Sequence, residues 1–351
     1  MVGHQLVVGF APEVRDQSQE IVARVRPSPG QYVLPQDAKA PWVRDLRSQP
    51  WVSVDNGVLW TEVAPEELEA DPECNVDSRD IDQLQGLPIV LDNGDLGLRV
   101  AVSDVDAFIK KGSALDRHMD INASSVYTPE VVFNLLPPEL AEDIASLNPR
   151  EDRLATVVEF SVSPQGDIYD EEVYPGLVHC VAKLDYASVG AWLEGKVEPS
   201  PAMQKHPDTL RSLQLQWQAS QQIREARQRR GSLEFERHEY TIQVQDGVAV
   251  GFEKPDKNAA SQLVENLMVT VNQVVSRFLR SRGYPTLERV VPPPAQWERI
   301  RELIELHGGQ LPKQPDGAAL SSFLASFKDT DPAMHQEVTF AVIKLIGAGE
   351  F

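Results

Sequence analysis

The sequence has 351 residues, of which 42% are hydrophobic, and a formal net charge of −20. Such a chain can bury a sizeable core as a globular protein of one large or two ordinary domains. Its apolar runs are too short and too often interrupted by charge to span a bilayer, and two cysteines, Cys74 and Cys180, make neither a disulfide framework nor a zinc site.

The start of the chain and its charge limit where the protein acts and what it binds. Residues 1–5 lack the basic start and apolar core of a signal peptide, which together with the few cysteines predicts a reduced, cytoplasmic location. The negative net charge argues against a broadly basic surface for nucleic acid, although an acidic protein can still line one channel with positive charge. The sequence identifies no protein partner.

The N-terminal residues predict one helix followed by a connector. Val14, Ile21, Val22 and Val25 follow Pro12 at helical spacing, which indicates a short amphipathic helix. The four prolines of residues 26–42 favour an extended connector. We therefore expect residues 1–44 to form a helix and connector that precede the main domain, residues 45–351.

An acidic stretch follows the first predicted strand, which covers residues 50–55 and ends at Asp55. The segment Ser78-Arg79-Asp80-Ile81-Asp82-Gln83 then places two carboxylates at i and i+2, with Asp77 just before them. Carboxylate oxygens are the ligands that Mg²⁺ and Mn²⁺ prefer, and such an ion suits phosphodiester chemistry. In a chain with 53 Asp and Glu residues, the alternative is a solvated acidic loop.

The rest of the chain alternates between predicted strands and helices. Apolar runs at residues 96–110 and 154–186 predict strands, among them residues 154–162 and 178–186. Further strands are expected at residues 234–236 and 240–244, with turns at Gly166-Asp167 and Asp246-Gly247. Helices are expected at residues 209–230, 259–282, 296–307, 317–327 and 331–347. This order of strands and helices agrees with the α+β fold, a mixed sheet surrounded by helices, that the family resemblance described below implies.

An arginine cluster ends the helix predicted at residues 209–230. It consists of Arg224, Arg227, Arg229 and Arg230. One interpretation is a solvated helix C-terminus, where cations are favoured by the helix dipole. The other is a patch that contacts phosphate.

The order of several segments resembles the RNB catalytic domain of the ribonuclease II and ribonuclease R family of 3′→5′ exoribonucleases. These segments are the aspartate motif at residues 78–83, the strand and acidic turn at 95–109, Gly112-Ser113-Ala114-Leu115-Asp116, residues 124–129, residues 134–140 and Ser146-Leu147-Asn148-Pro149. They are similar, in the same order, to the family's aspartate-rich motif, "VAIADVS", "GSxLD", "TSVYLP", "MLPxxLS" and "CSLNP" segments.

The resemblance implies roles for individual residues in the hydrolysis of single-stranded RNA to 5′-nucleoside monophosphates. Asp82 would be the residue essential for chemistry, while Asp55 and Asp80 would hold Mg²⁺ or Mn²⁺, with Gln83 or Asp77 assisting. Tyr127 would stack on a base near the RNA 3′ end. Glu265 and Asn272, in a helix similar to the family's "IxEEFMxxAN" helix, would contact that end or make structural hydrogen bonds, because polar groups on a largely buried helix need partners.

The chain departs from the family pattern in two places within the motif. Residues 56–79 look like an insertion that contains an acidic helical turn at residues 64–70, and they separate Asp55 from Asp80. Asp77 is therefore the alternative first ligand. Gln83 stands where the commonest family motif has a second adjacent aspartate, and it brings no negative charge.

A third departure concerns the C-terminal segment of the family. Family members continue into a segment like "HFGLA…SPIRRYPDL", whose arginines contact the scissile phosphate, whereas this sequence ends at Phe351. We therefore expect the C-terminal part of an RNB domain to be missing, in a fragment of a longer enzyme or in a degenerate relative. The alternative functions are a catalytically inactive RNB-like RNA-binding or scaffold protein and, less favoured, an unrelated metal-dependent phosphodiesterase.

Overall fold

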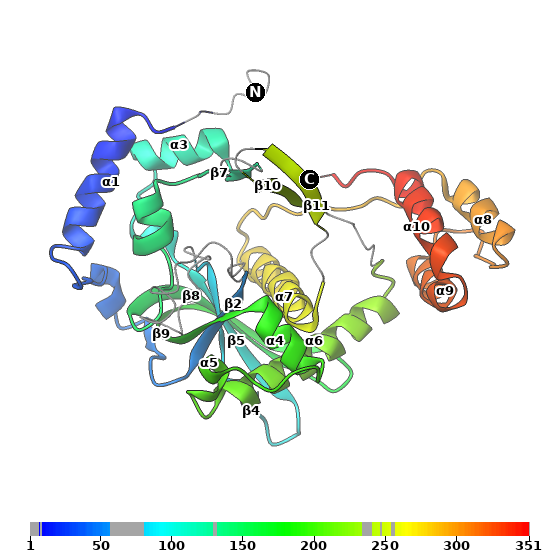
Figure 1. Ribbon diagram of the computed structural model, residues 1–351, viewed down its shortest axis with the longest axis horizontal. Helices are drawn as coiled ribbons and strands as arrows, with labels where there is room; N and C mark the ends of the chain where they lie inside the picture. Colours follow the sequence, from blue (N-terminus) through cyan, green and yellow to red (C-terminus); the bar gives the residue numbers. More distant parts are fainter. Residues whose placement is uncertain are drawn as a thin grey trace.

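The computed structural model describes residues 7, 9–56, 81–128, 132–233, 241–245, 248–253 and 257–350 (Figure 1). Its strands are β1 (Arg44–Asp45), β2 (Trp51–Asp55), β3 (Gln83–Gly86), β4 (Ile89–Val90), β5 (Leu96–Ser103), β6 (Val126–Tyr127), β7 (Val132–Phe133), β8 (Asp152–Val162), β9 (Ile168–Asp185), β10 (Thr241–Gln245) and β11 (Val248–Glu253). Its helices are α1 (Pro12–Val25), α3 (Ala114–Asn122), α4 (Tyr186–Leu193), α5 (Pro201–Gln204), α6 (Thr209–Arg229), α7 (Ala259–Ser281), α8 (Trp297–Leu306), α9 (Gly317–Thr330) and α10 (Pro332–Ile346), with short turns η1 (Gln36–Lys39), η2 (Val105–Ala107) and η3 (Glu139–Ile144).

The central sheet closes on itself. Its seven strands follow the order β1-β9-β2-β3-β5-β4, and β8 pairs with both β5 and β9. Strands β9, β2, β3, β5 and β8 therefore form a ring, which leaves none of these five strands with a fully open edge. Strand β2 is parallel to β9, while the other neighbours in the ring are antiparallel. The predicted mixed sheet of an α+β fold is confirmed.

Each face of the ring packs against a different set of side chains. We call the first set the inner core, because every ring strand contributes to it; it consists of Trp51, Ile81, Leu84, Ala101, Leu147, Ala155, Val157, Tyr174, Val178 and Cys180. The outer core joins the other face, at Val52, Val100 and Leu184 among others, to buried residues of α6 and α7. Figure 1 shows α4, α6 and α7 along this face of the sheet.

The predicted N-terminal helix is confirmed as α1, with Pro12 in its first turn and Val14, Ile21 and Val25 buried. These residues share one core with Leu115 of α3 and Leu140 of η3. The connector that follows contains η1 and leads into β1, which pairs with β9. The division of the chain at residue 44 stays a prediction.

The predicted helices of the second half are confirmed as α6 to α10. The asparagine that precedes α7, Asn258, forms a reciprocal capping box with Ser261, which explains why the helix begins there. Helices α8, α9 and α10 bury a separate core around Ile300, Leu324 and Val342, and in Figure 1 they lie to one side of the sheet. None of the described helices is long and apolar enough to cross a bilayer.

Candidate active site

Asp55 and Asp82 lie at the same edge of the sheet. Strand β2 ends at Asp55, and β3 runs antiparallel to β2, so β3 begins at the edge where β2 ends. Asp82 directly precedes β3, and its backbone carbonyl accepts a hydrogen bond from the amide of Ser103, the last residue of β5, at 2.9 Å. Two strand ends and one strand start thus meet at this edge, which we call the carboxylate edge.

Strand alternation also places Asp55 on the inner side of the ring. Trp51 belongs to the inner core, and side chains two or four residues away along a strand share its face. Asp55 lies four residues after Trp51, whereas Asp82 precedes β3 and follows Ile81, which itself belongs to the inner core. The structure therefore places two of the predicted metal ligands, one from each side of the inserted residues, at the same edge of the sheet.

Gln83 lies on the opposite face of the ring from Asp55. It pairs with Val102, which packs against the outer core, and its side-chain carbonyl accepts a hydrogen bond from the side-chain amide of Gln85. Residues directly opposite each other on neighbouring strands lie on the same face of a sheet. The structure thus does not bring Gln83 together with Asp55, contrary to our expectation of a shared ligand set.

Tyr186 lies beside Asp55, and sequence analysis did not identify it as a candidate. It follows Asp185, which is in register with Asp55 on the neighbouring parallel strand. Burial raises the pKa of Tyr186 to about 12, and the negative charge of Asp55 contributes in the same direction. The signal available in the sequence was an aromatic residue directly after a strand that ends in aspartate, the same kind of strand end that identified Asp55.

Asp185 has a structural role at this edge as the N-cap residue of α4. Its carboxylate caps α4 by accepting hydrogen bonds from the backbone amide of Ser188 at 2.7 Å and from the Ser188 hydroxyl at 2.5 Å. Such a cap satisfies a backbone donor at the helix start. We therefore do not count Asp185 as a metal ligand.

The chemistry of the donors at the carboxylate edge fits a hard divalent cation. Asp55 accepts a hydrogen bond from the amide of Asn56 at 2.7 Å, and Asp82 is exposed. Asp77, Asp80 and the helical turn expected at residues 64–70 lie outside the described residues. Within the described part of the chain, no three His, Cys, Asp or Glu side chains converge closely enough to hold a metal ion.

The three predicted RNA contacts lie on two elements. The backbone of Tyr127 pairs with Val132 in the small β6–β7 sheet, and the described structure does not include its side chain. Glu265 and Asn272 are exposed on α7, and Glu265 forms an ion pair with Lys257 at 2.7 Å. The expectation that burial would force these two residues to find partners was therefore wrong. The buried residues of α7 with hydrogen-bonding side chains are Asn266 and Thr270.

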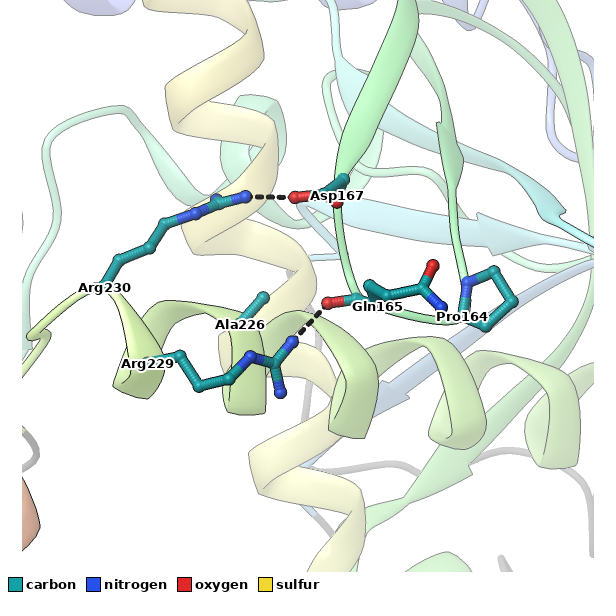
Figure 2. A pocket seen from close by; sticks show the side chains of 6 residues that line it. All are labelled: Pro164, Gln165, Asp167, Ala226, Arg229 and Arg230. Carbon is teal, nitrogen blue, oxygen red and sulfur yellow. Dashed lines mark hydrogen bonds and ion pairs between the residues drawn. The ribbon is translucent and has the colours of Figure 1, made fainter.

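The arginine cluster has protein partners. Arg227 donates to Asn266 at 3.2 Å, and Arg224 donates to Gln262 at 3.3 Å, so both attach α6 to α7. Figure 2 shows Arg229 bonded to the carbonyl of Gln165 and Arg230 paired with Asp167, in the turn between β8 and β9. A shallow pocket of about 370 Å³ lies between this turn and the end of α6.

The position of this pocket argues against a phosphate-contacting patch near the aspartates. Leu96 at the start of β5 pairs with Val162, next to the β8–β9 turn, whereas Ser103 at the end of β5 lies at the carboxylate edge. The eight residues of β5 therefore separate the pocket from that edge by roughly 23 Å. The cluster fits the structural interpretation better than the phosphate-binding one.

Comparison with known proteins identifies a family. The RNB domain profile matches residues 71–351. The chain is 29% identical over 307 residues to ribonuclease R of Vibrio parahaemolyticus, which covers 85% of this chain and 34% of the relative. It is 28% identical over 311 residues to ribonuclease R of Escherichia coli, with 85% and 35% covered. The chain thus spans about a third of the length of the curated relatives it matches.

Solved structures with the same fold include an RNase R and a pseudonuclease. Mycoplasma genitalium RNase R in complex with ribose-methylated single-stranded RNA matches 99% of this chain and 50% of its own, with a TM-score of 0.82 and 22% identity. A yeast pseudonuclease matches 97% of this chain and 40% of its own, with a TM-score of 0.64 and 15% identity. At these identities the similarity establishes the fold alone.

Proposed function

The chain belongs to the RNB domain family, and from this premise we propose that it acts as an exoribonuclease. It would hydrolyse single-stranded RNA from the 3′ end and release 5′-nucleoside monophosphates. The observation that carries the proposal is the convergence of Asp55 and Asp82 on one edge of the ring. A structural acidic loop gives no reason for two carboxylates that are separated by residues 56–81 to lie at the same edge.

Asp55, Asp80 and Asp82 would hold Mg²⁺ or Mn²⁺ at the carboxylate edge, with Asp77 as the alternative to Asp55. When bound, such an ion generates a nucleophile from water and stabilises the leaving oxygen. Gln83, on the other face of β3, would act on this site indirectly by fixing the start of the strand through its bond with Gln85.

The RNA end would be oriented by residues of β6 and α7. Tyr127 would stack on a base, which is worth about 1–3 kcal/mol per base and tolerates any sequence. Glu265 and Asn272 are accessible on α7, where Glu265 would exchange its ion pair with Lys257 for a contact to RNA. The ribonuclease R relatives and the RNase R–RNA complex support RNA as the substrate class.

The alternative function is a catalytically silent RNA-binding or scaffold protein. The yeast pseudonuclease has the same fold, so the fold by itself does not imply catalysis. The separation of Gln83 from Asp55 favours this alternative, whereas the position of Asp55 and Asp82 at one edge favours the enzyme.

The replacement Asp82→Asn tests the proposal. It removes one negative charge and keeps the shape of the side chain, so hydrolysis should fall by at least about 100-fold while RNA binding stays measurable, because the carboxylate acts in the reaction rather than in affinity. Release of 5′-nucleoside monophosphates from a uniformly ³²P-labelled oligonucleotide, with Mg²⁺ present, measures the first quantity, and fluorescence anisotropy in EDTA measures the second.

A matched control is Asp167→Asn, which changes an aspartate at the opposite edge of the same sheet. It should hydrolyse RNA at the wild-type rate. Equal rates for Asp82→Asn and wild type would exclude the proposed role of Asp82, and a wild-type protein that binds RNA without releasing nucleotides would establish the scaffold alternative.

A further inference from the structure

The backbone just before Asp82 is held by a neighbouring loop. The hydroxyl of Ser146 accepts a hydrogen bond from the amide of Ile81 at 2.8 Å, and the amide of Leu147 donates to the carbonyl of Ile81 at 2.9 Å. Both polar groups of one peptide segment are therefore paired with one loop. Ile81 and Ser146 are each 1% exposed, so water does not compete for these bonds.

The same loop also contacts Asp82 through the end of β5. The amide of Ser103 donates to the carbonyl of Asp82, and the hydroxyl of Ser103 donates to the carbonyl of Ala145. Residues 81 and 82 are thus fixed on two sides before β3 begins. The path of this backbone sets where the exposed side chain of Asp82 leaves the chain.

Ser146 is itself fixed by its neighbours. Its hydroxyl donates to the side-chain oxygen of Asn148 at 2.9 Å, which turns a lone pair toward the amide of Ile81. Its carbonyl accepts from the Arg153 guanidinium at 2.8 Å, and Arg153, 2% exposed, lies 3.6 Å from the centre of the Tyr32 ring. A buried chain of contacts thus extends from the N-terminal connector to the segment that presents Asp82.

We propose that Ser146 is a positioning residue for the carboxylate edge: its hydroxyl sets the path of the backbone that presents Asp82 to a divalent cation. This inference rests on the proposed function, because it assumes that Asp82 holds such an ion. Outer groups that orient metal ligands typically change metal affinity about 10- to 100-fold when they are removed.

The test compares two equally buried serines. Ser146→Ala removes the hydroxyl beside Ile81, and Ser220→Ala removes a hydroxyl, 0% exposed, that accepts from Asn266 at 3.1 Å between α6 and α7. Both lose a buried hydrogen bond, but only the first lies at the carboxylate edge. We would measure Mn²⁺ affinity by electron paramagnetic resonance without RNA, and kcat and KM for an RNA oligonucleotide with Mg²⁺.

Ser146→Ala should raise the Kd for Mn²⁺ about 10- to 100-fold and lower kcat by a similar factor, with KM for RNA unchanged. Ser220→Ala should keep the wild-type Kd and kcat. Asn148→Ala, at a half-buried residue, leaves the Ser146 hydroxyl in place without its acceptor and should shift the Kd in the same direction by less.

Wild-type Mn²⁺ affinity in Ser146→Ala, or an equal shift in Ser220→Ala, would overturn the inference. If Ser146→Ala does not fold, Asn148→Ala decides, and an unchanged Kd in that variant also overturns it. These outcomes leave the proposed function intact, because the wild-type protein still binds Mn²⁺ and releases nucleotides. A wild-type protein that does neither would overturn both.

Discussion

At the scale of single residues, Arg153 is the most deeply buried of the basic side chains that the structure describes. Its guanidinium is almost fully buried, bonded to Glu151 and to the carbonyl of Ser146, and stacked on Tyr32. Arg26 at the end of α1 pairs with the same Glu151 and with Asp143. A buried charge of this kind is stable only while its partners remain in place.

Replacing Arg153 with methionine should therefore lower the free energy of unfolding by about 3–5 kcal/mol. The Glu151 carboxylate and the Ser146 carbonyl would each lose their bond to the guanidinium in a site that excludes water. Urea denaturation at pH 7 measures the change. Arg44→Met is the control, since Arg44 is 47% exposed and pairs with exposed Glu172, an arrangement worth about 0–1 kcal/mol. A smaller loss for Arg153→Met than for Arg44→Met would refute this description of the network.

At the scale of elements, the β8–β9 turn packs at Gly166 directly against the backbone of α6. Gly166 has φ of +79°, and a Cβ there would lie 2.0 Å from the backbone carbonyl oxygen of Gln222 and 2.8 Å from the Cβ of Ala226. No side chain fits this space unless α6 moves away from the sheet. The predicted hairpin turn at Gly166-Asp167 is thus also the place where a helix packs on the turn.

Gly166→Ala should cost about 2–4 kcal/mol, as the sum of a left-handed backbone conformation and overpacking against α6. Gly94→Ala is a control with φ of +84° and nothing within 4 Å of the added Cβ, so it isolates the conformational cost of about 1 kcal/mol. Thermal denaturation of the two variants compares them. Equal losses of stability in the two variants would show that packing against α6 adds nothing to the cost of Gly166→Ala.

Elements with a long, regular pattern could be predicted from the sequence, and those that depend on distant partners could not. The apolar period of α7 and the Pro12 start of α1 are local signals, and both helices begin where expected. Strand β3 begins at Gln83, the last residue of the aspartate motif, where no strand was expected. Strand β9 extends from Ile168 to Asp185, twice the expected length, because its residues 168–179 pair with β8 and its residues 180–185 pair with β2.

At the scale of the whole molecule, the ring explains which predicted site residues meet. The pairing of β8 with both β5 and β9 is a non-local feature that no local pattern in the sequence reveals. It closes the sheet, defines an inner face, and places Asp55 on that face and Gln83 on the other. The residue types and their order could be predicted from the sequence, whereas the side of the sheet on which each residue lies required the fold.

The central claim is that Asp55 and Asp82 act as one unit across the inserted residues. The most direct measurement is the Mg²⁺-dependent rate of 5′-nucleoside monophosphate release by wild type, Asp55→Asn, Asp82→Asn and the double variant. Residues that act as a unit lose activity non-additively, so each single variant should lose at least about 100-fold and the double variant should be no slower than the slower single one. Wild-type activity in Asp55→Asn, or losses that multiply in the double variant, would contradict the claim.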